Sequence, residues 1–198
     1  MSRRRLIWLI VVAAAAPVTP LPAQTSFALA AGFSGPRGDL GHAVNTGYHV
    51  LASIATDAGM YLPTGRDRAQ RSNAGSPFRV RVDGGVTEFK YKLPTNATNA
   101  KARVLSGTAN ALVSPPRFGG GYIIGGIGIY QMSAECDGCT TSTTKGGANG
   151  GVGYELRLTS IRLFAEARYH YIAGPSDPTN GGVRSSTQFV PISLGVIF

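Results

Sequence analysis

One pattern recurs along the chain: segments of about ten residues in which apolar and polar side chains alternate, separated by turn residues. In 161–171 the odd positions read Ile, Leu, Ala, Ala, Tyr and Tyr, and the even positions read Arg, Phe, Glu, Arg and His. A helix of this sequence would carry apolar residues all round its axis, whereas a strand separates the two kinds onto opposite faces. The pattern therefore predicts a β-strand with one apolar and one mostly polar face.

The same alternation predicts seven further strands, which brings the total to eight. Only Ser160 and its neighbours separate two of them, so we expect a tight hairpin there. Between Pro77 and Lys92 the phase of the alternation changes at Gly84-Gly85, which indicates a β-bulge. The seven segments are 27–33, 48–54, 78–92, 104–113, 122–132, 152–159 and 188–198.

The N-terminus predicts a secretory signal peptide over residues 1–23. Arg3–Arg5 form a basic cluster, and the apolar run Leu6–Ala16 follows it before a small residue, Ala23. That run is too short for a membrane-spanning helix, which needs about 20 apolar residues. Because no later segment is long and apolar enough either, the remaining domain, 24–198, could cross a membrane only as a closed barrel.

The composition fits an exported β protein. The chain has 27 glycines, 15% charged residues and a formal net charge of +9. Removing Arg3–Arg5 with the signal peptide leaves 16 basic and 10 acidic residues, which is a moderate excess. An exported chain without a basic stripe is not expected to bind nucleic acid, whereas a basic exterior favours contact with anionic lipopolysaccharide.

The last strand carries an apolar row that ends on the terminal aromatic residue. This row consists of Val190, Ile192, Leu194, Val196 and Phe198. It resembles the C-terminal assembly signal of bacterial outer-membrane barrels. With its signal peptide, its alternating strands and this terminal row, the chain resembles the small eight-stranded outer-membrane β-barrel family, the OmpA-like and OmpX-like porin fold.

This resemblance implies an all-β, eight-stranded antiparallel transmembrane up-and-down β-barrel in the outer membrane of a Gram-negative-type bacterium. It also implies insertion by the barrel-assembly machinery. With the N-terminus in the periplasm, the outer loops are expected at Ser34–Thr46, Leu93–Ala102, Ala134–Gly147 and Gly174–Thr187. The periplasmic turns are expected near Ser114–Phe118 and at Ser160, and the long basic segment Ala58–Ser76 departs from the family's short turns.

The predicted inward faces collect charged side chains, which we interpret as a lumen charge network. These residues are Arg79, Arg81, Asp83, Glu155, Arg157, Arg162, Glu166, Arg168 and His170. An eight-stranded barrel is just wide enough to be filled by side chains, so the favoured reading is structural pairing across strands. The alternative is a polar pore or a binding site.

Cys136 and Cys139 lie in the third expected outer loop. A C-x-x-C pair can form a disulfide, bind a metal or act in redox chemistry, and an oxidising compartment favours the disulfide. The neighbouring Glu135 and Asp137 disfavour a reactive thiolate. His42, His49 and His170 have no metal-site or catalytic spacing, and we expect no cofactor or metal.

Ser72-Asn73-Ala74-Gly75 resembles part of the motif of outer-membrane lipid A deacylases. That family has a histidine two residues before the serine, where this chain has Gln70, so the serine lacks its base and no enzyme activity is expected.

The favoured function is a non-enzymatic membrane anchor whose loops bind a ligand or mediate adhesion. The loop regions favoured for this role are Arg37–Asn45, Asn96–Arg103, Cys136–Lys145 and Asp177–Arg184. The alternatives are a narrow porin-like channel, a lipid-modifying enzyme and a soluble secreted β-sandwich.

Overall fold

Eight antiparallel strands and one short helix make up the described part of the protein. The computed structural model describes residues 25–58, 77–92, 100–115, 118–136, 139–159, 161–174 and 186–198, without the side chains of 136–140. The strands are β1 (Thr25–Arg37), β2 (Gly47–Asp57), β3 (Phe78–Lys90), β4 (Lys101–Val113), β5 (Gly121–Cys136), β6 (Cys139–Arg157), β7 (Arg162–Ile172) and β8 (Thr187–Ile197), and the helix is α1 (Gly38–Ala43). The predicted signal peptide and most of the segment Ala58–Ser76 lie outside the described residues.

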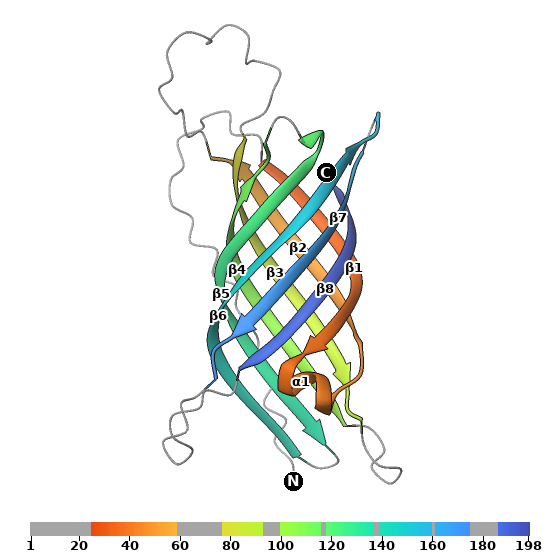
Figure 1. Ribbon diagram of the computed structural model, residues 1–198, viewed down its shortest axis with the longest axis vertical. Helices are drawn as coiled ribbons and strands as arrows, with labels where there is room; N and C mark the ends of the chain where they lie inside the picture. The colour runs from red at the N-terminus through yellow and green to blue at the C-terminus, as the bar shows by residue number, and fades with distance from the viewer. Residues whose placement is uncertain are drawn as a thin grey trace, which may run out of the picture.

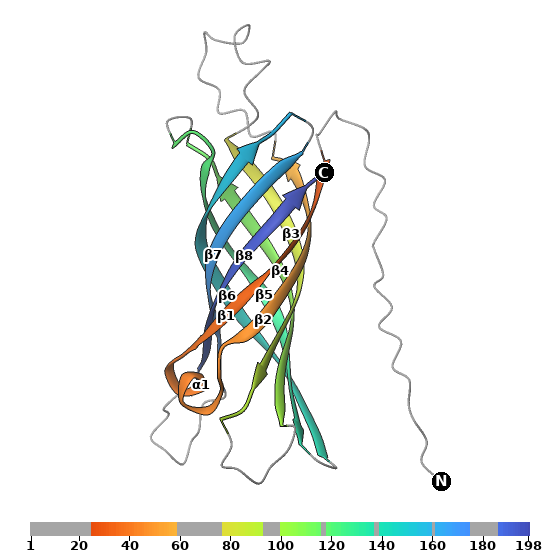
Figure 2. The same ribbon diagram turned by 90° about the vertical axis from the view of Figure 1, so that its right-hand side faces the viewer.

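The strands form one closed up-and-down barrel in which each strand pairs with its neighbours in sequence and β8 pairs with β1 (Figure 1). The predicted eight-stranded antiparallel barrel is confirmed. Register partners followed once around the barrel from Ser26 lead back to β1 at Pro36, ten residues further along. This shear tilts the strands strongly against the barrel axis, as the ribbon in Figure 2 shows.

The alternation seen in the sequence separates an inner and an outer face. Phe33, Ile127 and Leu194 point outward and are 73%, 71% and 69% exposed. Inward positions are buried and are polar in the middle of the barrel. An outer face with this much exposed apolar area is unfavourable in water and requires an apolar surrounding.

The two ends of the barrel differ. Thr25 and Phe198 lie at one end, which we call the terminal end, and α1 lies at the other, which we call the α1 end (Figures 1 and 2). No helix among the described residues is long and apolar enough to cross a membrane.

The strands at the α1 end are longer than the sequence predicts. An outer loop was expected at Ala134–Gly147, but β5 runs to Cys136 and β6 starts at Cys139, so only 137–138 separate the two strands. This expectation is wrong because threonine is β-branched and favours strands, and four of the five residues from Thr140 to Thr144 are threonine, so a strand forms here without apolar alternation. The loop expected at Ser34–Thr46 is also shorter, since β1 reaches Arg37 and α1 follows.

The prediction of a bulge at Gly84-Gly85 is wrong. The pairing with β2 continues through both glycines without interruption, from Ser53 opposite Asp83 to Val50 opposite Val86. What changes is the chemistry of each face, because the inward positions beyond the glycines hold an apolar cluster and the outward positions carry charge. The strand therefore keeps its phase while its polarity reverses.

Candidate functional site: the charged interior of the barrel

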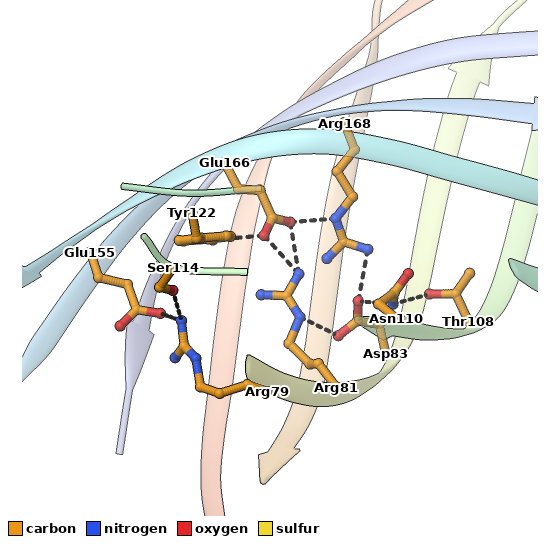
Figure 3. Close-up of polar contacts among 10 residues, drawn as sticks. All are labelled: Arg79, Arg81, Asp83, Thr108, Asn110, Ser114, Tyr122, Glu155, Glu166 and Arg168. Carbon is orange, nitrogen blue, oxygen red and sulfur yellow. Dashed lines mark hydrogen bonds and ion pairs between the residues drawn. The ribbon is translucent and has the colours of Figure 1, made fainter. Parts of the chain in front are cut away.

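Four buried charged side chains form a closed ring inside the barrel (Figure 3). Arg81 Nη2 donates to Glu166 Oε2 at 2.7 Å and Oε1 at 2.9 Å, and Arg81 Nε lies 3.0 Å from Asp83 Oδ1. Arg168 closes the ring, with Nη1 2.7 Å from Asp83 Oδ2 and Nε donating to Glu166 Oε1. Two arginines thus alternate with two carboxylates, and the ring has no net charge.

Two neutral side chains add hydrogen bonds to the carboxylates. The Tyr122 hydroxyl donates to Glu166 Oε2 at 2.7 Å, and Asn110 Nδ2 donates to Asp83 Oδ2 at 2.8 Å and to Thr108 Oγ1 at 2.9 Å. Each charged side chain of the ring is at most 6% exposed. Buried charge is tolerated when it is paired, and every charged side chain of this ring has an ion-pair partner. The hydrogen bonding is less complete, since Arg81 Nε, Asp83 Oδ1 and Arg168 Nη2 are buried without a hydrogen bond to any described residue.

The ring joins opposite walls of the barrel. Arg81 and Asp83 belong to β3, and Glu166 and Arg168 belong to β7, which is four strands away in a ring of eight. Spacing by two residues places each pair on one face of its strand. The contacts therefore brace the barrel across its diameter.

Inward glycines on β5 and β6 leave the space that these long side chains occupy. A Cβ at Gly153 would lie 2.7 Å from Tyr122 Cε1 and closer still to Cζ. A Cβ at Gly151 would lie 3.0 Å from Arg168 Cγ. The glycines thus make room in the charged layer, because their missing side chains admit their register partners Tyr122 and Arg168 on the neighbouring strands.

An apolar cluster fills the interior between the ring and the α1 end. His170 stacks on Phe189 at 4.8 Å between ring centroids, Phe89 meets Phe189 edge-on at 5.9 Å, and the Tyr130 hydroxyl lies 3.0 Å from His170 Nδ1. We call this cluster the aromatic plug; its buried apolar members are Val44, Phe89, Val104, Tyr130, Ile172 and Phe189. Towards the terminal end, Phe164, Leu51 and Leu112 pack in two further clusters.

The remaining residues of the predicted lumen network are placed differently. Arg79 Nη2 pairs with Glu155 Oε1 at 2.6 Å, separately from the ring. His170 belongs to the aromatic plug. Arg157 and Arg162 are register partners at the terminal end, and neither has an ion pair among the described residues.

Comparison with solved structures identifies the architecture. Neisserial surface protein A has a TM-score of 0.53 at 18% identity, over 87% of this chain and 95% of its own. A major outer membrane protein from Thermus thermophilus has a TM-score of 0.53 at 13% identity, over 90% of this chain and 99% of its own. This is the fold of the small eight-stranded outer-membrane β-barrels. No protein-family model and no curated protein matches the sequence.

In the fold of an outer-membrane barrel, the exposed apolar side chains of the outer face contact lipid. The last strand follows this rule: the row Val190, Ile192, Leu194 and Val196 points outward, and the inward positions between them include Ser193. The terminal Phe198 is 67% exposed and extends the pairing with β1 through a hydrogen bond to Phe27.

The favoured loop residues of this outer-membrane barrel fold are only partly described. Arg37 ends β1, and Gly38–Ala43 form α1. Cys136 and Cys139 are register partners at the tip of the β5–β6 hairpin, but their side chains lie outside the description, so the disulfide stays a prediction. Residues 96–99, 177–184 and the serine motif at 72–75 also lie outside the described part of the chain.

Several interior residues were not among the predicted site residues. Tyr122, Asn110 and Asn149 are buried beside or near the ring, and His49 Nδ1 lies 2.8 Å from Thr87 Oγ1. The signal that could have found them is the strand phase, because each occupies an inward position. The predicted network contained only charged residues and one histidine, so the neutral tyrosine and asparagines at inward positions were not included.

The arrangement has the chemistry of a structural network. Both ring carboxylates are occupied by arginines, so neither is free to act as a base. Among the described residues, no group of three His, Cys, Asp or Glu side chains could hold a metal ion.

Proposed function

We propose that the protein is a non-enzymatic outer-membrane barrel that does not conduct and that anchors a binding surface at its α1 end. The observation that carries this proposal is the filled interior. A neutral ring of ion pairs crosses the barrel, and the aromatic plug fills the space between this ring and the α1 end. A narrow channel would need a continuous wet path through both layers. The packing therefore favours an anchor over a channel.

The α1 end is the side that faces the exterior in this proposal. β5 and β6 have 16 and 19 residues against 11 to 13 in the other strands, and they project at that end (Figure 1). Residues 141–144 are Thr, Ser, Thr and Thr, and their exposed hydroxyl groups suit a polar ligand. A rigid barrel holding such a hairpin is an economical support for adhesion or ligand binding.

Two partners follow from the outer face. The barrel-assembly machinery would recognise the outward row of β8 that ends at Phe198, and outer-leaflet lipopolysaccharide would surround the α1 end. A cleaved signal peptide over residues 1–23 would direct the chain to this membrane.

The test is to fractionate cells that express the full chain and compare boiled with unboiled samples by gel electrophoresis. We expect a heat-dependent change of mobility in the outer-membrane fraction, and no conductance steps when the purified barrel is placed in a planar lipid bilayer. Steady single-channel steps would contradict the anchor proposal and support a channel. A single mobility in the soluble fraction would contradict the membrane location itself.

A further inference from the structure

A charged cluster lies on the outer face of the barrel, next to the band of exposed apolar side chains and on its α1 side. We call it the rim cluster, and it consists of Glu88, Lys90, Lys101, Arg103 and Glu135 on β3, β4 and β5. These residues share the strand phase of outward side chains such as Val82 and Ala109. One outward step towards the terminal end, the row Val50, Val86 and Leu105 is apolar. The rim cluster therefore begins where the apolar band ends.

At the centre of the rim cluster is a carboxylate that is buried although it faces outward. The Glu88 side chain is 5% exposed, with Oε1 3.1 Å from Lys101 Nζ and Oε2 accepting from Arg103 Nη2 at 3.0 Å. Both cations stay about half exposed, at 42% and 47%. One buried anion thus pairs with two cations that stay partly exposed.

The cluster has more positive charge than its carboxylates neutralise. Lys90 and Lys101 are register partners on the same face, and like charges in directly opposite positions destabilise a sheet. Lys90 is exposed and has no ion pair among the described residues, while Glu135 approaches Arg103 only to 3.9 Å. Three cations against two carboxylates leave the surface with an unmatched positive charge.

We propose that the rim cluster binds the phosphate group of a phosphorylated glycolipid headgroup in the surrounding outer leaflet. This inference rests on the proposed membrane location. A phosphate carries up to two negative charges, and its oxygens accept charge-assisted hydrogen bonds from Arg103, Lys101 and Lys90 together. The position just above the apolar band is the level at which a lipid headgroup meets the barrel, whereas a soluble ligand would have no reason to be bound there.

The experiment measures lipid binding to the full-length protein, purified from membranes in neutral detergent, by native mass spectrometry. The probes are a bisphosphorylated diglucosamine lipid and its dephosphorylated form. Because the dephosphorylated lipid lacks the charge-assisted hydrogen bonds to the phosphate, we expect the phosphorylated lipid to bind at least about tenfold more tightly. Inorganic phosphate in excess should not displace it.

Variants locate the site. Lys101→Gln combined with Arg103→Gln should remove the preference for the phosphorylated lipid. Lys90→Gln should weaken this preference by about threefold to tenfold. It breaks no ion pair within the described part of the protein, so we expect the variant to keep its heat-dependent mobility. Lys145→Gln is the matched control. Lys145 is the register partner of the inward Tyr130, so this substitution removes the same charge from the inner face and should leave the lipid preference unchanged.

The outcomes separate this inference from the proposed function. Each variant could keep its heat-dependent mobility and still bind both lipids with the same affinities as the unsubstituted protein. That result would overturn the phosphate site and leave the proposed barrel unaffected. If inorganic phosphate displaces the lipid, the cluster binds free phosphate and the lipid assignment is overturned. Loss of the heat-dependent mobility in the unsubstituted protein would overturn the membrane location instead.

Discussion

Glu166→Gln should destabilise the barrel strongly, because Glu166 neutralises two buried arginines. The substitution keeps the size of the side chain and an oxygen that can accept from Tyr122, but it leaves Arg81 and Arg168 with Asp83 as their common anion. A charge-assisted hydrogen bond contributes about 1.5–3 kcal/mol. Glu166 accepts from both arginines, with both of its oxygens from Arg81 Nη2 and with Oε1 from Arg168 Nε. We therefore expect the free energy of unfolding to fall by about 3–5 kcal/mol, the range for breaking a buried ion pair.

The measurement is urea-induced unfolding of the purified barrel in phosphatidylcholine vesicles, followed by circular dichroism and by gel mobility without heating. Arg162→Gln is the matched control on the same face of β7, and its effect should stay within about 0.5 kcal/mol because Arg162 has no ion pair among the described residues. Glu166→Gln combined with Arg168→Gln restores neutrality, so it should cost less than the sum of the single substitutions by about 0.5–3 kcal/mol. Additive effects, or a loss below about 0.5 kcal/mol for Glu166→Gln, would refute the neutral ring as a stabilising unit.

Three further changes test the packing around the ring with the same assay. Gly153→Ala should lower the free energy of unfolding by about 1–3 kcal/mol, because its Cβ would overlap the Tyr122 ring. Gly84→Ala, whose Cβ would have nothing within 4 Å, should leave that free energy unchanged or raise it. Equal effects of the two substitutions would contradict the role of the inward glycine. Phe189→Ala should cost about 3–5 kcal/mol by opening a cavity in the aromatic plug, and an unchanged urea midpoint would indicate a loosely filled interior. Ile127→Arg should cost about 2–4 kcal/mol on the lipid face, while Thr143→Arg on the projecting hairpin should fold normally; the reverse order would place the apolar band elsewhere.

Strand alternation predicted the barrel well because its cause is local. Each strand separates lipid from interior along its whole length, so the positions of Phe33, Leu194 and the arginines of β3 followed from the phase alone. The same phase placed Arg81, Asp83, Glu166 and Arg168 inside. Which of them pair could not be predicted, because that depends on two strands lying opposite each other across the barrel.

The errors occurred where the environment changes near the ends of strands. The bulge predicted at Gly84-Gly85 was inferred from a reversal of polarity, which here marks the aromatic plug inside and the rim cluster outside. The β5–β6 hairpin was expected to be a loop because its residues 141–144, all exposed, show no alternation of apolar and polar side chains. Reading polarity as a proxy for phase is reliable only within the apolar band.

The most direct test of the account is to measure which face of the barrel contacts lipid. From Gln24 onward the chain contains no tryptophan, so Val82→Trp on the outer face and Thr143→Trp on the projecting hairpin each introduce a single fluorophore. In vesicles of a phosphatidylcholine brominated at the middle of its acyl chains, we predict strong quenching for Val82→Trp and little for Thr143→Trp. Equal and weak quenching of both would contradict a barrel that spans the membrane with this face in lipid.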